Sequence, residues 1–530
     1  MKAIKQFLLQ PWLYLVIVLA GASLKLYHID YHIFWYDEIC TIQHTSGNQI
    51  LDIPVNEIKN ISFYDDQLHL KKQNLTIGSE LKGLYGSTNL NPLHYTFLML
   101  WYRITGDDYI SYRLFNVFIF ILTLPVLFLL AKTLFKSNLA GYIAISLYAV
   151  APIFHYFVHE ARYNTLLVFI IILLHYIFLQ AIAQKKIKWW IGYSLIGVLA
   201  MYASVLSGLI LFGHFVYIIF LKKDTRIVYS INLLIILVCY LPWIISIYNN
   251  VSEINDAFVW HSNLGRNKNF LSLLLYQLIG FSHIFASFTE EGQYFRLFLA
   301  NKFEGNYIQL ISDIIVLSFI LCSIIYTIKK APGKVAYFLI FIVLPYVLFF
   351  YISDIIRNTG CSLVWRYHLI IYIGVMLFVV YILYRKIALG KLFYSSIYLG
   401  LIIVGFISII SISQSRYFVG SGGATKIKEA QLYSKARRPL LITDFSMSIA
   451  TRGVEDFSVI LKECKSESID ILRASPDIKN VDKMLLDSSY SDIYVTHASS
   501  ELVDNLMMQF GEKMKKPKGE GIPGLWQIKY

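Results

Sequence analysis

Two adjacent carboxylates and three arginines lie where strongly apolar segments of the chain begin or end. Asp37 and Glu38 follow the first apolar segment, in the stretch FWYDEICTIQ, and later segments are flanked by Arg113, Arg162 and Arg366. A carboxylate at a membrane surface can stay ionised and act as a general base on a hydroxyl group. The planar guanidinium group of arginine matches the oxygens of a phosphate. These residue types therefore predict a site that handles a phosphate and an acceptor hydroxyl beside a membrane.

Each of these signals has a plainer interpretation. Asp37 and Glu38 could form a solvated acidic turn after a helix, or they could together hold a divalent cation, which prefers oxygen ligands. A single arginine could reach the phosphates of ordinary lipids. Charged groups at membrane depth are costly, however, and tend to pair or to line a site. Several such groups at one face of the membrane favour a functional site.

The composition fixes the class of protein that must position these residues. Of 530 residues, 57% are hydrophobic and only 15% are charged. A soluble chain of this length carries more charge on its surface. The net charge of +13 comes mainly from short basic clusters between apolar segments, so it indicates contact with membrane lipids rather than with nucleic acid. We expect an α-helical polytopic membrane protein.

About eleven apolar segments are long enough to cross a bilayer. They cover residues 11–26, 112–131, 138–158, 163–183, 189–205, 207–221, 227–247, 308–328, 335–352, 367–384 and 392–413. With the N-terminus in the cytoplasm, every basic cluster between them is cytoplasmic, as the positive-inside rule expects. The stretch from Asn91 to Gly106 is too short to cross, and we interpret it as an interfacial helix of the outer leaflet.

This topology predicts two domains. Residues 1–413 form the transmembrane domain, with outer loops at 30–111, 248–307 and 353–366. Residues 414–530 form a small α/β domain on the outer side, because strand-like stretches such as RPLLITDF and DIYVTHAS alternate with helical ones such as ELVDNLMMQF. All the candidate site residues then face the outer side.

Five motifs in a fixed order carry a resemblance to a known family. They are FWYDE, NPLHYTFLMLW, YRLFNVF, HEARYN and WRYHLIIYIGV. Over about residues 10–385 the chain resembles the GT-C membrane glycosyltransferases of the superfamily that includes the protein O-mannosyltransferases and the aminoarabinose transferases (glycosyltransferase family 39-like).

The resemblance implies a sugar donor carried on a polyprenyl phosphate and used at the outer face of the cell membrane, in the periplasm or outside. It places the catalytic acid at Asp37, with Glu38 beside it. It places the donor phosphate or the acceptor near a further set of residues, namely Arg113, His94, His159, Glu160, Arg162, Tyr163 and Arg366. The chain departs from the family at Asn91-Pro92, where a double proline is usual, and at His94, where an aromatic residue is common. The acceptor therefore stays open among glycan, lipid and protein.

The expected reaction is a single displacement with inversion at the anomeric carbon, in which Asp37 deprotonates the acceptor and arginines stabilise the departing phosphate. A transporter or flippase of lipid-linked sugars is the alternative, and a non-catalytic scaffold is a third. A transporter favours repeated halves and ionisable groups at the bilayer midplane. Here the informative charges lie at one face, which favours the transferase. A divalent cation stays possible at Asp37 and Glu38.

Overall fold

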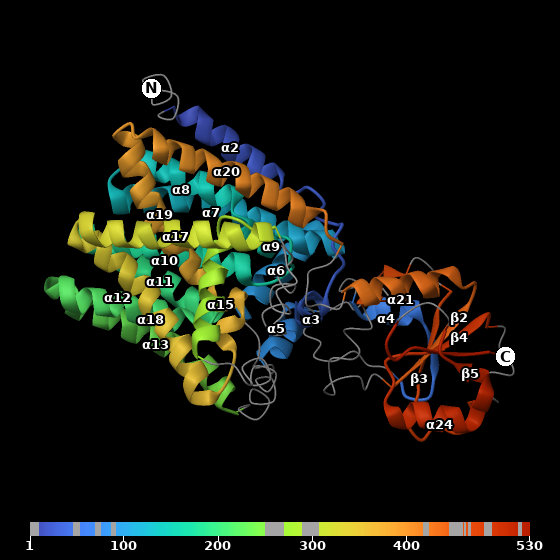
Figure 1. Ribbon diagram of the computed structural model, residues 1–530. Coiled ribbons are helices and arrows are strands. Elements are labelled where there is room, and N and C mark those ends of the chain that lie inside the picture. The colour runs from blue at the N-terminus through green and yellow to red at the C-terminus, as the bar shows by residue number, and fades with distance from the viewer. Residues whose placement is uncertain are drawn as a thin grey trace.

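The protein is described from a computed structural model that is mostly helical, with one small sheet near the C-terminal end (Figure 1). The described residues are 10–45, 54–68, 76–85, 92–249, 270–288, 307–416, 423–444, 459–460, 463–464, 468–481, 490–517 and 522–529.

Seven helices in the described part of the chain are long and apolar enough to cross a membrane. They are α7 (Tyr109–Phe135), α10 (Asn164–Gln184), α13 (Arg226–Asn249), α17 (Tyr307–Lys330), α18 (Gly333–Arg357), α19 (Trp365–Ala388) and α20 (Leu392–Ser413). Each coincides with a segment that the sequence predicted to cross. The protein is thus a multi-pass membrane protein with an α-helical core.

The other four expected crossings are shorter or broken. The apolar helices α2 (Pro11–Ser23), α11 (Ile187–Ala203) and α12 (Ser207–Leu221) have 10–17 residues. The pair α8 (Asn138–Val150) and α9 (Pro152–Val158) is bent by 58°. Pro152 has no backbone N–H and cannot continue α8, which explains the bend. The total of about eleven crossings stays a prediction.

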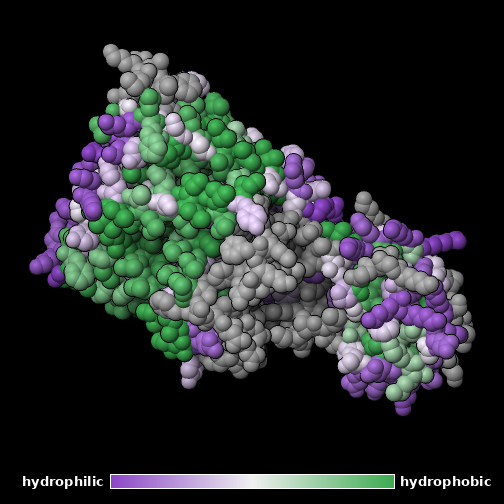
Figure 2. Space-filling view, in the orientation of Figure 1, coloured by the Kyte–Doolittle hydropathy of each residue, from purple (hydrophilic) through white to green (hydrophobic). Residues whose placement is uncertain are grey.

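Helix α19 lies at the centre of the bundle. In its most apolar window 94% of the residues are buried, against 28% for α13 and for α17. The peripheral helices expose large apolar side chains instead, such as Ile314 and Ile315 of α17. Figure 2 shows hydrophobic side chains over much of the visible face of the helical part, as a lipid-facing surface requires.

Four short helices lie in the described part of residues 30–111, the first predicted outer loop. They are α3 (Tyr36–Thr45), α4 (Ile61–Leu68), α5 (Ile77–Tyr85) and α6 (Pro92–Thr105). The last corresponds to the helix expected from Asn91 to Gly106, and its end coincides with Gly106 at φ 101°, a value that suits glycine. Helix α3 carries Asp37 and Glu38, and α6 packs against α3, α7 and α11.

The described part of the second predicted outer loop enters the helical bundle. Helix α15 (Phe270–Ser282) contacts α17, α18 and α19. The residues that follow it, from His283 to Ala286, are at most 3% exposed. The assignment of residues 248–307 to an outer loop did not anticipate this entry into the bundle.

A six-stranded sheet forms the second unit of the fold, with strand order β1-β3-β2-β4-β6-β5. Strands β2 (Pro439–Thr443), β3 (Asp470–Arg473) and β4 (Asp492–Val495) are parallel, and β5 (Met514–Lys515) and β6 (Trp526–Ile528) complete one edge antiparallel. Helices α21 (Gly423–Lys435) and α24 (Ser500–Phe510) flank the sheet (Figure 1). The expected α/β character of this region is confirmed.

The other edge of this sheet comes from far away in the sequence. Strand β1 (Ile58–Asn60) belongs to the first outer loop and pairs antiparallel with β3, with Lys59 opposite Ile471. The side chain of Asn56 reinforces the pairing by accepting a hydrogen bond from the backbone N–H of Ser475 at 2.8 Å. The loop that carries the two acids is therefore also a part of the C-terminal sheet.

Candidate active site

Helix α3 presents its two acids in different directions. Glu38 stands at the third helical position and accepts a hydrogen bond from the backbone N–H of Trp35 at 3.3 Å, as in a capping box. Both acids lie in the first turn, where negative charge stabilises the helix. Successive residues of an α-helix are about 100° apart around its axis. Asp37 and Glu38 therefore contact different partners.

Glu38 is completely buried and forms a two-pronged ion pair with Arg113. Nε of Arg113 donates to Oε1 of Glu38 and Nη2 to Oε2, both at 2.9 Å. The exposed fraction of the two side chains is 0% and 1%. Oε1 also accepts from the backbone N–H of Ala161 at 2.8 Å, which ties α3 to the turn between α9 and α10. Such a pair needs this full set of hydrogen bonds to offset its lost hydration.

The remaining donors of Arg113 bind the segment that follows α2. Nη1 donates to the carbonyls of Ile29 at 2.7 Å and His32 at 3.0 Å, and Nη2 donates to the carbonyl of Ile33 at 3.3 Å. The guanidinium also lies 4.3 Å from the ring centre of Phe34. An arginine has five N–H groups, and here all five are used inside the protein. In this structure Arg113 has no donor left for a phosphate.

Asp37 lies between two other arginines. Nη1 of Arg366 is 2.5 Å from its Oδ2, and Nη2 of Arg162 is 3.3 Å from the same oxygen. The side chains of Asp37, Arg162 and Arg366 keep 13%, 14% and 20% of their surface exposed. A third contact joins Nη1 of Arg162 to the carbonyl of Asp37 at 3.0 Å. This cluster brings together three of the predicted site residues, from three distant segments, in a partly open position.

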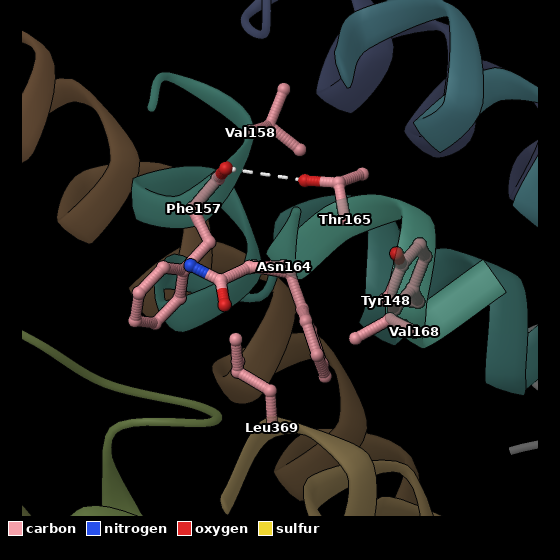
Figure 3. A pocket seen from close by; sticks show the side chains of 8 residues that line it. Tyr148, Phe157, Val158, Asn164, Thr165, Val168 and Leu369 are labelled. Carbon is pink, nitrogen blue, oxygen red and sulfur yellow. Dashed lines mark hydrogen bonds between the residues drawn. The ribbon is translucent and has the colours of Figure 1, made fainter. Parts of the chain in front are cut away.

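The turn that carries Arg162 is held from two sides. The side-chain amide of Asn116, on α7, donates to the carbonyl of Glu160 and, at 3.2 Å, to that of Arg162. Thr165 at the start of α10 donates from Oγ1 to the carbonyl of Phe157 in α9 at 3.1 Å (Figure 3). This hydrogen bond joins the two helices on either side of the turn. Asn116 lies three residues after Arg113, on the same face of α7. That spacing, together with its place in the motif YRLFNVF, was the sequence signal for its role, which the predicted set of site residues missed.

The other predicted residues surround the cluster at different depths. Glu160 is 2% exposed. The guanidinium carbon of Arg162 lies over the ring of Tyr163, 5.6 Å from the centre of that ring. His94 is 1% exposed, and burial, assisted by the charge of Arg162, lowers its pKa to about 3. It is therefore neutral at physiological pH.

His159 lies on the side of α2. Its Nε2 is 3.0 Å from the carbonyl of Lys25, and burial, helped by the nearby His32, holds its pKa well below the ordinary value. A neutral, completely buried imidazole with these contacts is part of the packing around the Glu38–Arg113 pair. Its ring contacts His32 and His155 rather than Asp37.

The two acids face different partners in this structure, and a cation shared between them stays a prediction. Each carboxylate oxygen of Glu38 already accepts two hydrogen bonds, so only Asp37 faces the partly open side. Within the described ranges no group of three or more His, Cys, Asp and Glu side chains converges as a metal site would require.

Known proteins supply the context for this geometry. Residues 90–246 match the family model of dolichyl-phosphate-mannose-protein mannosyltransferases. The crystal structure of ArnT from Cupriavidus metallidurans bound to undecaprenyl phosphate matches with a TM-score of 0.51 at 12% identity, over 97% of each chain. The chain has the GT-C fold of ArnT.

The apo crystal structure of the same ArnT gives a TM-score of 0.50 at 10% identity, over 98% of this chain and 97% of that one. No curated protein sequence matches the chain. The family match covers His94, Arg113 and the turn with Arg162, whereas Asp37 and Arg366 lie outside it. The family match and the GT-C fold together indicate a membrane glycosyltransferase.

Proposed function

We propose that the protein transfers a sugar from a polyprenyl-phosphate donor to an acceptor hydroxyl at the outer face of the membrane. Asp37 is the general base, and Arg162 and Arg366 bind the phosphate of the donor. The observation that carries this assignment is the partly open cluster of one carboxylate between two guanidinium groups. The ArnT structure with undecaprenyl phosphate supports the donor class, because that protein shares the fold.

The cluster also suggests how the base becomes active. In the structure both guanidiniums bind Asp37, and such pairing makes a carboxylate a weaker base. A phosphate offers the same guanidiniums more oxygens and more charge. When the donor phosphate engages Arg162 and Arg366, it competes with Asp37 and releases it toward the acceptor. The base is then strongest when the donor is present.

The displacement follows from these positions. Asp37 takes the proton of the acceptor hydroxyl, and the hydroxyl oxygen bonds to the anomeric carbon as the bond from that carbon to the phosphate oxygen breaks. The electron pair leaves with the polyprenyl phosphate, whose charge the two arginines stabilise. A single displacement inverts the anomeric configuration. No nucleotide is needed, because the lipid phosphate is itself a leaving group.

Glu38 and Arg113 have a different role in this proposal. Their five donors and two carboxylate oxygens are engaged inside the protein, so they contact no substrate. They fix α3 against α7 and against the turn that carries Arg162. Arg113, which the sequence placed near the donor phosphate, is thus proposed as a positioning residue.

The test is sugar transfer by the purified protein in lipid nanodiscs, from a synthetic polyprenyl-phosphate sugar to a panel of acceptors. Asp37→Asn should lower the rate by about 10²–10⁴-fold, the usual effect of losing a general base. Asp108→Asn is the matched control, because Asp108 is exposed at the start of α7 and its side chain makes no capping hydrogen bond. Equal rates for the two variants, or transport of the donor without transfer, would refute the proposal.

A further inference from the structure

The connection between α18 and α19 is a tight turn organised around one buried carboxylate. Helix α18 ends at Arg357, and Asn358 adopts a left-handed conformation with φ 51°. The short 3-10 helix η3 (Cys361–Leu363) follows, and α19 begins at Trp365. Asp354, in the last turn of α18, is only 2% exposed and lies beneath this connection.

Three donors of the turn converge on Asp354. Its Oδ1 accepts from Oγ1 of Thr359 at 2.7 Å and from the backbone N–H of Cys361 at 2.8 Å. Its Oδ2 accepts from the backbone N–H of Ser362 at 2.7 Å. Hydrogen bonds to an ionised carboxylate are about twice as strong as neutral ones. Asp354 therefore fixes the path of the turn from Thr359 to Ser362, shortly before α19 begins.

The same turn leads directly to Arg366. Nε2 of His368 is 3.0 Å from the carbonyl of Ser362, so the turn is also fastened to the first turn of α19. Trp365 is held by ring contacts to His283 at 4.5 Å and Tyr276 at 5.6 Å between ring centres. The next residue, Arg366, reaches the Asp37 carboxylate. Small displacements at the start of α19 thus translate into displacements of the Arg366 guanidinium.

We infer that Asp354 is a positioning residue that sets the Arg366 guanidinium for the donor phosphate. The inference rests on the proposed function, and it adds a residue outside the substrate cluster. A phosphate clamp works only when its donors are held in a productive geometry, and supporting residues supply that accuracy. Asp354 touches neither Asp37 nor Arg366, and it acts through the backbone from Thr359 to Ser362.

A double-mutant cycle on the binding of polyprenyl phosphate tests this role. Asp354→Asn keeps the shape of the side chain but turns part of the acceptor into a donor, which opposes the N–H groups of Cys361 and Ser362. In the otherwise unchanged protein it should weaken binding by about tenfold. In an Arg366→Ala background it should have almost no further effect, because the group that it positions is gone. Where binding by that variant is too weak, Arg366→Lys serves as the background, since a flexible ammonium depends less on orientation.

Asp444→Asn is the matched control. Asp444 also accepts from the start of a helix, through the backbone N–H of Ser499 at 3.0 Å, but it lies in the C-terminal sheet region. It should leave phosphate binding unchanged. Equal losses from Asp354→Asn in both backgrounds, or none in either, would overturn the role of Asp354 and leave the donor assignment in place. Absence of polyprenyl-phosphate binding by the unmodified protein would overturn both.

Discussion

Asp37 and Glu38 are neighbours in the chain, yet they lie in opposite surroundings. Glu38 is fully buried, pairs with one arginine, and accepts four hydrogen bonds. Asp37 is partly exposed and shares one oxygen between two arginines that are themselves partly exposed. The buried pair is closed to a substrate, whereas the open cluster is partly exposed.

The difference shows how an active site can divide its charges. A closed ion pair holds the elements together, and removing one partner lowers the free energy of unfolding. An open cluster keeps donors within reach of a ligand and exchanges partners when the ligand arrives. Substitutions in the closed pair should change stability, whereas substitutions in the open cluster should change the handling of the donor.

The largest effect is expected from breaking the closed pair. Glu38→Gln leaves the buried guanidinium of Arg113 without its counter-charge, and losing one partner of a buried pair costs about 3–5 kcal/mol of unfolding free energy. The thermal unfolding midpoint in detergent should fall markedly. Asp37→Asn, measured beside it, should shift the midpoint far less, because Asp37 is partly hydrated. A stable Glu38→Gln protein would place Glu38 outside the structural framework.

The next effect concerns the arginines. Arg366→Lys keeps the charge but removes the guanidinium fork, so polyprenyl-phosphate binding should weaken about tenfold while the unfolding midpoint is retained. Arg113→Lys should instead lower the unfolding midpoint while the folded protein still binds polyprenyl phosphate, since a lysine cannot replace five donors inside the protein. Titration of both variants with the lipid, alongside thermal unfolding, gives the comparison. Loss of binding by a stable Arg113→Lys variant would return that residue to the phosphate site.

A smaller effect has an unexpected direction. If Asp37 competes with the donor phosphate for Arg162 and Arg366, then Asp37→Asn should bind polyprenyl phosphate more tightly, by about threefold, although its transfer is lost. Equilibrium binding of the lipid to both proteins measures this. Weaker binding by Asp37→Asn would show that the carboxylate assists the phosphate and does not compete with it.

The smallest effect concerns pH and His94. The pKa of His94 is about 3 in the folded protein and 6.5 ordinarily, so between these values the unfolded chain binds a proton that the folded chain does not. Stability should therefore fall as the pH is lowered through this window. His94→Gln should reduce, but not abolish, the fall in the unfolding midpoint between pH 7 and pH 5, because burial also lowers the pKa of His44, to about 4. Identical pH profiles would contradict the neutral state of His94.

Part of this architecture could be predicted because it is encoded locally. Apolar length alone placed the transmembrane helices, and the alternation of strand-like and helical stretches placed the C-terminal α/β unit. The short apolar stretch from Asn91 was correctly predicted as a helix, α6. The entry of α15 into the bundle and the addition of β1 to the C-terminal sheet were not predictable in this way. Both depend on pairing with elements more than twenty residues away, which no local pattern encodes.

By itself, the sequence determined that the protein lies in a membrane and where its long apolar helices run, and it predicted that carboxylates and arginines stand at one face of that membrane. Only the tertiary structure decided which acid pairs with which arginine. Arg113 is 75 residues from Glu38, and Arg366 is 329 residues from Asp37. Their roles diverge because a helix turns adjacent side chains about 100° apart, so one acid faces the packed bundle and the other faces the opening. Burial and partners, set by the packing of distant helices, are the basis on which we propose a structural role for Glu38 and a chemical role for Asp37.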